Sequence, residues 1–170
     1  MLVKQYGARR FNRVYPNEVV GGQSVFYGGA SLRLRETDMA RWPISYAELE
    51  PHYGRAEGLL GVHGQAGQDP HEPPRSSGYP AGPIALTEPA RRLHAAAQEL
   101  GFRPFPIPLA INFSSDARPL CIRCNTCDGF PCRIEAKNDM AVTLLAEAQE
   151  KGLEIAAGTI VRRLVEEGGR

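Results

Sequence analysis

The sequence predicts an α/β fold, with helices and short extended segments arranged as an α+β fragment over this stretch of chain. Three observations predict it: a helix with a complete start signal, two further helices each followed by glycine, and a strand-like closing segment. Hydrophobic residues make up 42% of the 170 residues, which fits a globular chain. The formal net charge of +1 gives no support to a nucleic-acid or membrane-surface role.

The first helix is predicted over residues 46–60, within "WPISYAELEPHYGRAEGLLGV". Ser45 and Glu48 have the spacing of a capping box, in which each residue satisfies a backbone N–H at the helix start. Gly61 is the expected stop. Pro51 lies inside the helix and is expected to kink it or shorten its first part.

Two more helices are predicted, over residues 88–100 and 140–151. Each has a candidate cap before it and a glycine after it, which are the usual signals of a helix start and end. These residues are Thr87 and Gly101 for the second helix, and Asp139 and Gly152 for the third.

Three segments are predicted to be non-helical. Residues 61–86 are rich in proline and glycine and predict a long surface connection. Residues 102–113 are expected to be extended, because their prolines forbid a helix and disfavour a central strand. Residues 153–170 predict two short strands at the end of the chain.

Two glycine pairs, Gly21-Gly22 and Gly28-Gly29, bracket a loop near the start of the sequence. Glycine permits positive φ and lets a backbone approach a ligand closely, and such a loop can point N–H groups at an anion. The loop is neither a Walker P-loop nor a G-x-G-x-x-G turn. From the residues alone, a tight turn and a ligand-binding loop both remain open.

All four cysteines fall within "CIRCNTCDGFPC", a Cys-rich loop over residues 121–132. The first three match the C-x₂-C-x₂-C spacing of ferredoxins, but the fourth comes one residue late. Zinc sites usually use two pairs of ligands separated by a dozen or so residues. Iron–sulfur ligands, zinc ligands and plain thiols or local disulfides all remain open. The candidate ligands are Cys121, Cys124, Cys127 and Cys132.

The glycine loop and the segment after it resemble the FAD-binding domain of the glucose–methanol–choline (GMC) oxidoreductases. The resemblance rests on "VGGQSVFYGGASLRLR", on "WPISYAELEPHYGRAEGLLGV" and on "AKNDMAVTLLAEAQEKGLEIAAGTIVRRL", and covers most of residues 19–167. It implies that residues 1–170 are part of a Rossmann-like FAD-binding domain. The first βαβ nucleotide turn of that domain is not in the sequence.

The resemblance also implies which residues contact FAD. They are Gly21, Gly22, Gln23, Ser24, Tyr27, Gly28, Gly29 and Val161. The first part of the loop would approach the diphosphate or ribityl chain, the second part the isoalloxazine, and Val161 the adenine. Gln23 and Tyr27 depart from the residues usual in the family. Phe26 stands where some members attach FAD through histidine, so no covalent link is expected there.

The function implied by the resemblance is oxidation of a CH–OH donor, an alcohol, sugar or sugar acid, by hydride transfer to FAD. The family's late catalytic histidine pair is not in the sequence, so no catalytic residue is assigned. We therefore expect an internal fragment of a longer enzyme, inactive alone, with its true N-terminus missing. Cytoplasmic and periplasmic locations both stay open. No apolar run of about 18 residues predicts a membrane span.

The expected partners are a small-molecule alcohol or sugar and an electron-acceptor subunit, with no nucleic acid. Certain GMC dehydrogenases carry a three-cysteine iron–sulfur cluster before a segment like Ala136-Lys137, with different spacing, and such a cluster would relay electrons from FAD. Two alternatives compete with the flavoenzyme. One is a small metal-binding module that uses the cysteines as iron–sulfur or zinc ligands. The other is a non-catalytic interaction domain built around the proline-rich connection.

Overall fold

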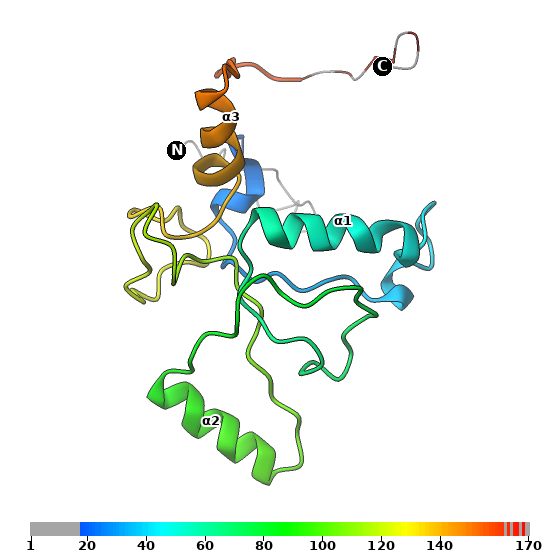
Figure 1. Cartoon of the computed structure of the whole chain (residues 1–170), viewed down its shortest axis with the longest axis vertical. Helices are drawn as coiled ribbons and strands as arrows, with labels where there is room; N and C mark the ends of the chain where they lie inside the picture. The colour runs from blue at the N-terminus through cyan, green and yellow to red at the C-terminus, as the bar shows by residue number, and fades with distance from the viewer. Residues whose placement is uncertain (1–17, 162, 164, 167, 169–170) are drawn as a thin grey trace, which may run out of the picture.

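The computed structural model describes residues 18–161, 163, 165–166 and 168, and over these the chain is helical and irregular. Its elements are η1 (Gly22–Val25), η2 (Glu36–Met39), α1 (Tyr46–Leu59), α2 (Glu88–Glu99), η3 (Ala141–Leu145) and α3 (Ala146–Glu150). In the body of the molecule α1 lies across the middle, while α2 and α3 lie toward opposite ends of the long axis (Figure 1). β-structure within the described residues is limited to isolated bridges.

Helix α1 begins where the sequence predicts. The Ser45 N–H donates to Glu48 Oε2 at 2.8 Å, and the Glu48 N–H donates to Ser45 Oγ at 3.3 Å, which completes the capping box. The helix ends at Leu59, and the φ of 55° at the nearby Gly61 allows the chain to reverse. Both predicted boundaries are therefore confirmed to within one residue.

Pro51 does not shorten α1, because the helix runs through it from Tyr46 to Leu59. The other predicted effect of Pro51, a kink, stays a prediction. Proline removes one backbone hydrogen bond, the one to the carbonyl of Ala47. Both residues are exposed, so water can solvate that carbonyl. The loss is therefore tolerated at this position.

The other two helices match their predicted ranges to within one residue at each end, but the structure at their starts differs from the prediction. Thr87 occupies the start of α2, but its side chain makes no capping hydrogen bond, so that detail was wrong. The third helix is split into a π turn, η3, followed by α3. Its cap is confirmed, because Asp139 Oδ1 accepts from the N–H groups of Ala141 at 2.8 Å and Val142 at 3.1 Å.

The predicted closing strands are absent over residues 153–161, so the prediction was wrong there; the rest of that segment lies partly outside the described residues. The hydrogen bonds in this stretch are local, from Leu153 N–H to the Ala148 carbonyl and from Ala157 N–H to the Ile155 carbonyl. A β-strand forms only where an adjacent backbone segment can exchange N–H···O=C hydrogen bonds with it. Figure 1 shows this segment extending away from the body beyond α3.

The core is centred on residues 109–112, which bridge three distant segments. The Ala110 N–H donates to the Gly29 carbonyl at 2.7 Å, and the Asn138 N–H donates to the Ala110 carbonyl at 3.0 Å. On another side, the His63 N–H donates to the Leu109 carbonyl at 2.9 Å. Chain segments far apart in sequence are thus joined without a regular sheet.

The connection over residues 61–86 is not a surface segment throughout, which corrects the prediction. Val62 is fully buried and His63 is 8% exposed, and His63 forms a bridge to Ala81. His63 Nδ1 lies 3.0 Å from the Gly82 carbonyl oxygen. This histidine is therefore a packing residue.

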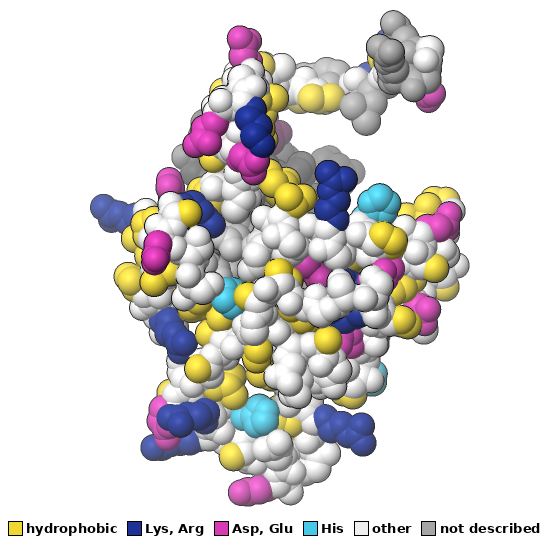
Figure 2. Space-filling view, in the orientation of Figure 1, with side chains coloured by type: hydrophobic (Ala, Val, Ile, Leu, Met, Phe, Trp, Pro, Cys, Tyr) yellow, Lys and Arg dark blue, Asp and Glu magenta, His cyan; other side chains and the backbone are white. Residues whose placement is uncertain are grey.

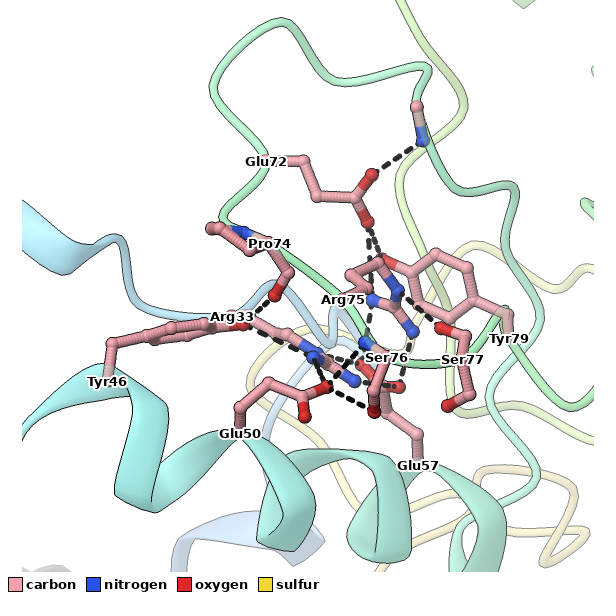
Figure 3. A network of polar contacts seen from close by, with 11 residues as sticks. Arg33, Tyr46, Glu50, Glu57, Glu72, Pro74, Arg75, Ser76, Ser77 and Tyr79 are labelled. Carbon is pink, nitrogen blue, oxygen red and sulfur yellow. Dashed lines mark hydrogen bonds and ion pairs between the residues drawn. The ribbon is translucent and has the colours of Figure 1, made fainter.

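A buried network of charged side chains fixes the rest of this connection to α1 (Figure 3). Arg33 holds both oxygens of Glu57 at 2.8 Å, and Arg75 donates to the same carboxylate at 3.1 Å and 2.5 Å. Arg33 also donates to Glu50 at 2.9 Å. Because buried charges are costly unless paired, the shared carboxylate makes Arg33, Glu57 and Arg75 mutually dependent.

Charged side chains of both signs are interspersed over most of the face shown in Figure 2. Large apolar side chains are exposed on and just after α2, where Leu93 is 73% and Leu100 is 76% exposed. Across the described part of the chain, no helix has both the length and the apolar character needed to cross a bilayer.

The network predicts a loss of stability in acid. Hydrogen bonds from the Ser76 N–H and from Arg33 lower the pKa of Glu50 from 4.5 to about 2. Burial raises the pKa of Glu57, but its bonds to Arg33 and Arg75 outweigh burial and lower it. Both carboxylates therefore stabilise the fold above their unfolded-state pKa, and this contribution is lost as the pH falls through the folded-state pKa.

We expect the free energy of unfolding in urea to fall as the pH drops from 4.5 toward about 2. The Glu50→Gln variant should be less stable at neutral pH and should show a shallower decline in this range. Parallel pH profiles for the variant and the parent protein would contradict this assignment.

Candidate functional site

The glycine loop, residues 21–29, is the predicted ligand loop, and its backbone requires glycine at several positions. Gly21, Gly22 and Gly29 have φ values of 89°, 59° and 81°, in the left-handed region that side-chain-bearing residues avoid. A Cβ on Gly29 would lie 2.8 Å from Ile111 Cγ1, too close for any real contact. The need for glycine at this position therefore comes from the packing of the chain itself.

The loop is open at Gly22, where the resemblance places FAD. Among the described residues, nothing lies within 4 Å of the point where a Cβ on Gly22 would be. A Cβ on Gly28 would meet Asp128 at an ordinary contact distance of 3.7 Å, so that side of Gly28 is occupied. Gly22 therefore leaves room for a flat ligand or a phosphate to approach the backbone, which is what a cofactor loop requires.

The start of the third helix supports the loop from one side. Tyr27 Oη donates to the Asn138 carbonyl at 2.6 Å, and the Met140 N–H donates to Ser24 Oγ at 3.0 Å. Ser24 Oγ in turn donates to the Gly21 carbonyl at 2.7 Å. The structure thus brings together the predicted loop residues and a segment far along the chain.

The Tyr27 hydroxyl is committed to this support. Burial, and then the nearby Asp139 carboxylate, raise the pKa of Tyr27 to about 12. The hydroxyl therefore stays protonated and can donate to the Asn138 carbonyl at every physiological pH. Tyr27 is one of the predicted isoalloxazine contacts, and its hydroxyl proton is donated to the protein backbone.

The Cys-rich loop supports the glycine loop from another direction. The Gly129 N–H donates to the Phe26 carbonyl at 2.8 Å. Lys137, whose exposure is 0%, sends its Nζ to the carbonyls of Tyr27 at 2.7 Å, Cys127 at 2.9 Å and Phe130 at 2.8 Å. Lys137 is thus a second direct link between the two loops.

Reasoning from the sequence did not assign Lys137 a role. Lysine is almost never fully buried, so a single lysine normally indicates a surface position. The one available signal was its place immediately before the residues that begin the third helix, in the segment that resembles the GMC family.

The four cysteines are free thiols on one loop. Cys124 is exposed and Cys121, Cys127 and Cys132 are half-buried. Within residues 18–161 and the few described beyond them, no three His, Cys, Asp or Glu side chains gather so that they could hold a metal ion. The proposed metal-ligand role of these cysteines stays a prediction that this arrangement does not support.

Val161 is separated from the other predicted FAD contacts. It is 75% exposed and lies on the segment that leaves the body beyond α3 (Figure 1). The structure therefore does not bring it together with the glycine loop.

A polar cavity of about 250 Å³ lies beside Asn138, where the end of α1 meets the start of the third helix. Its polar lining includes His63, Asn112, Arg118 and Thr143. Each of these four side chains already makes at least one hydrogen bond within the protein.

Comparison with known proteins places this arrangement in context. A family model described as GMC oxidoreductase matches residues 10–170. The chain is 39% identical over 141 residues to 6'''-hydroxyparomomycin C oxidase of Streptomyces lividus, and 36% identical over 144 residues to paromamine 6'-oxidase of Streptomyces fradiae. Each alignment covers 75% of this chain, and 25% and 24% of the respective relative.

A more distant relative is the gluconate 2-dehydrogenase flavoprotein of Pantoea cypripedii, 28% identical over 141 residues, which are 71% of this chain and 23% of the relative. The chain therefore spans about a quarter of the length of the curated relatives it matches.

The glycine loop predicts different outcomes for two neighbouring substitutions. Gly29→Ala should cost about 1–3 kcal/mol, because the added methyl overlaps Ile111 and the backbone has positive φ. Gly28→Ala should change stability by less than about 0.5 kcal/mol, since its methyl meets Asp128 at ordinary contact distance. Urea unfolding of both variants measures the difference, and equal stabilities would contradict the geometry.

The thiols should react in a set order. Hydrogen bonding to Thr126 lowers the pKa of exposed Cys124, whereas burial, and then the neighbouring thiols, raise the pKa of Cys127. Because the thiolate is the reactive form, iodoacetamide should label Cys124 first and Cys127 last. Mass spectrometry of the digested protein gives the rates. Labelling in urea is the control, and equal rates in the folded protein would contradict the prediction.

Proposed function

The chain belongs to the GMC oxidoreductase family, and on this premise we propose that it forms part of the FAD site of an enzyme that oxidises a CH–OH group. The observation that carries the proposal is the glycine loop: within the described part of the chain its backbone is open at Gly22, while two other segments hold it in place. A preformed and supported loop is what a tightly bound cofactor requires.

Bound FAD would supply the chemistry of the reaction by accepting hydride from the CH–OH carbon. The residues of this chain have the simpler task of binding and orienting it. Gly22 leaves backbone surface accessible, and Ser24 fixes the loop through Gly21 and Met140. We propose that α1 and the third helix belong to a Rossmann-like FAD domain that surrounds this loop.

The proposed donor is a small polyhydroxylated molecule. The relatives are named for the oxidation of hydroxyparomomycin C and paromamine, and for the dehydrogenation of gluconate. An electron-acceptor subunit remains part of the proposal, since another relative is named as the large subunit of fructose dehydrogenase.

A metal-binding role for the Cys-rich loop is not part of the proposed function. Its support is the C-x₂-C-x₂-C spacing and the resemblance to cluster-bearing GMC dehydrogenases, and no three ligand side chains converge within the described residues. Analysis of the purified protein for iron and zinc tests this directly.

The FAD proposal is tested with the complete protein that carries this chain. Titration with FAD, followed by flavin fluorescence, should show saturable binding. Gly22→Ala should weaken that affinity by about tenfold or more, or about 1.4 kcal/mol, because its methyl points into the open space where the proposal places the diphosphate or ribityl chain of FAD.

Gly101→Ala is the matched control. Gly101 is exposed and, like Gly22, has a positive φ and no described atom within 4 Å of an added methyl, so FAD affinity should not change. A parent protein that fails to bind FAD, or a Gly22→Ala variant that binds it as tightly as the parent, would refute the proposal.

A further inference from the structure

Lys137 is a fully buried cation whose hydrogen bonds are completely used inside the protein. An ammonium has three N–H donors, and Nζ meets three carbonyl oxygens at 2.7–2.9 Å. The acceptors belong to Tyr27 in the glycine loop and to Cys127 and Phe130 in the Cys-rich loop. No donor is left over for water or a ligand, so Lys137 does not act by contacting a ligand itself.

The three acceptors of Lys137 are neutral carbonyls rather than carboxylates, so none of them cancels its positive charge. Nζ lies 5.8 Å from the centre of the Tyr27 ring, and its charge acts to lower the pKa of Cys127, against the larger effect of burial. In a low-dielectric interior, a cation without a carboxylate partner exerts a stronger field on nearby groups than a solvated one does.

We propose that Lys137 is a positioning residue for the flavin, which both fixes the Tyr27–Gly28 peptide and places a positive charge immediately behind it. This inference rests on the proposed function, in which the isoalloxazine lies against Gly28. A flavin gains negative charge when it is reduced, so a buried cation behind the loop favours the reduced form. Lys137 thereby raises the reduction potential of the bound flavin.

Three substitutions separate the two parts of this role. Lys137→Met keeps the apolar stem and removes the charge and all donors, whereas Lys137→Gln removes the charge but keeps two donors. Lys137→Arg keeps the charge, but its donors lie in a planar fork that cannot match three carbonyls arranged around a point. Lys151→Met is the control, because Lys151 is an exposed lysine paired with Glu147 on α3.

The experiment measures the midpoint potential of the flavin in the complete FAD-loaded protein by spectroelectrochemistry, together with FAD affinity and urea unfolding. We expect Lys137→Met and Lys137→Gln to shift the oxidised–reduced equilibrium at least tenfold toward the oxidised form. For a two-electron couple this corresponds to about 30 mV. Lys137→Arg should weaken FAD binding while keeping the potential closer to that of the parent, and Lys151→Met should change neither quantity.

The outcomes distinguish the inference from the proposed function. If the parent binds no FAD, the proposed function itself fails. If the parent and all variants bind FAD at one potential, the inference is overturned and the proposed function stands. If both uncharged variants lose FAD while Lys137→Arg retains it, the requirement for charge is supported. Loss of FAD from all three variants would show that Lys137 is only a structural clamp, and would overturn its effect on the potential.

Discussion

The position of the glycine loop depends on one buried ammonium. Lys137 binds a carbonyl of that loop and two carbonyls of the Cys-rich loop, so the three segments cannot move independently. The adjacent Asn138 and Met140 add backbone contacts to Tyr27 and Ser24. Residues 137–140 thus act as a single support, and the loop that faces the proposed cofactor takes its shape from the protein rather than from the ligand.

A second set of buried charges holds the remainder of the body. The Glu57 carboxylate on α1 is shared by Arg33 and Arg75, which belong to two otherwise irregular segments (Figure 3). Over the described residues the structure has isolated bridges and no sheet. Backbone N–H and C=O groups that would pair in a sheet must find other partners, and side chains supply some of them. A charge removed from such a network leaves its partners buried and unpaired, which is why these contacts act together.

The sequence predicts the local features of this structure well and its long-range features poorly. The caps at Ser45 and Asp139 and the reversal at Gly61 are set by residues only a few positions apart, so pattern reasoning identifies them. The burial of His63 and Lys137 depends on segments that meet only in the folded chain. The prediction of strands over residues 153–161 was wrong for the same reason. A local sequence pattern does not show whether a second segment will lie beside a strand and pair with it. Most predicted FAD contacts lie together on one loop, while Val161 lies apart from it.

The central claim is that FAD binds on the glycine loop and is held there through residues 137–142. Hydrogen–deuterium exchange of the complete protein, with and without FAD, tests it most directly. The account predicts slower exchange on FAD addition at the backbone amides of residues 21–29 and 137–142, with no change in α2. Protection confined to other parts of the protein, with unchanged exchange in both of these segments, would contradict it.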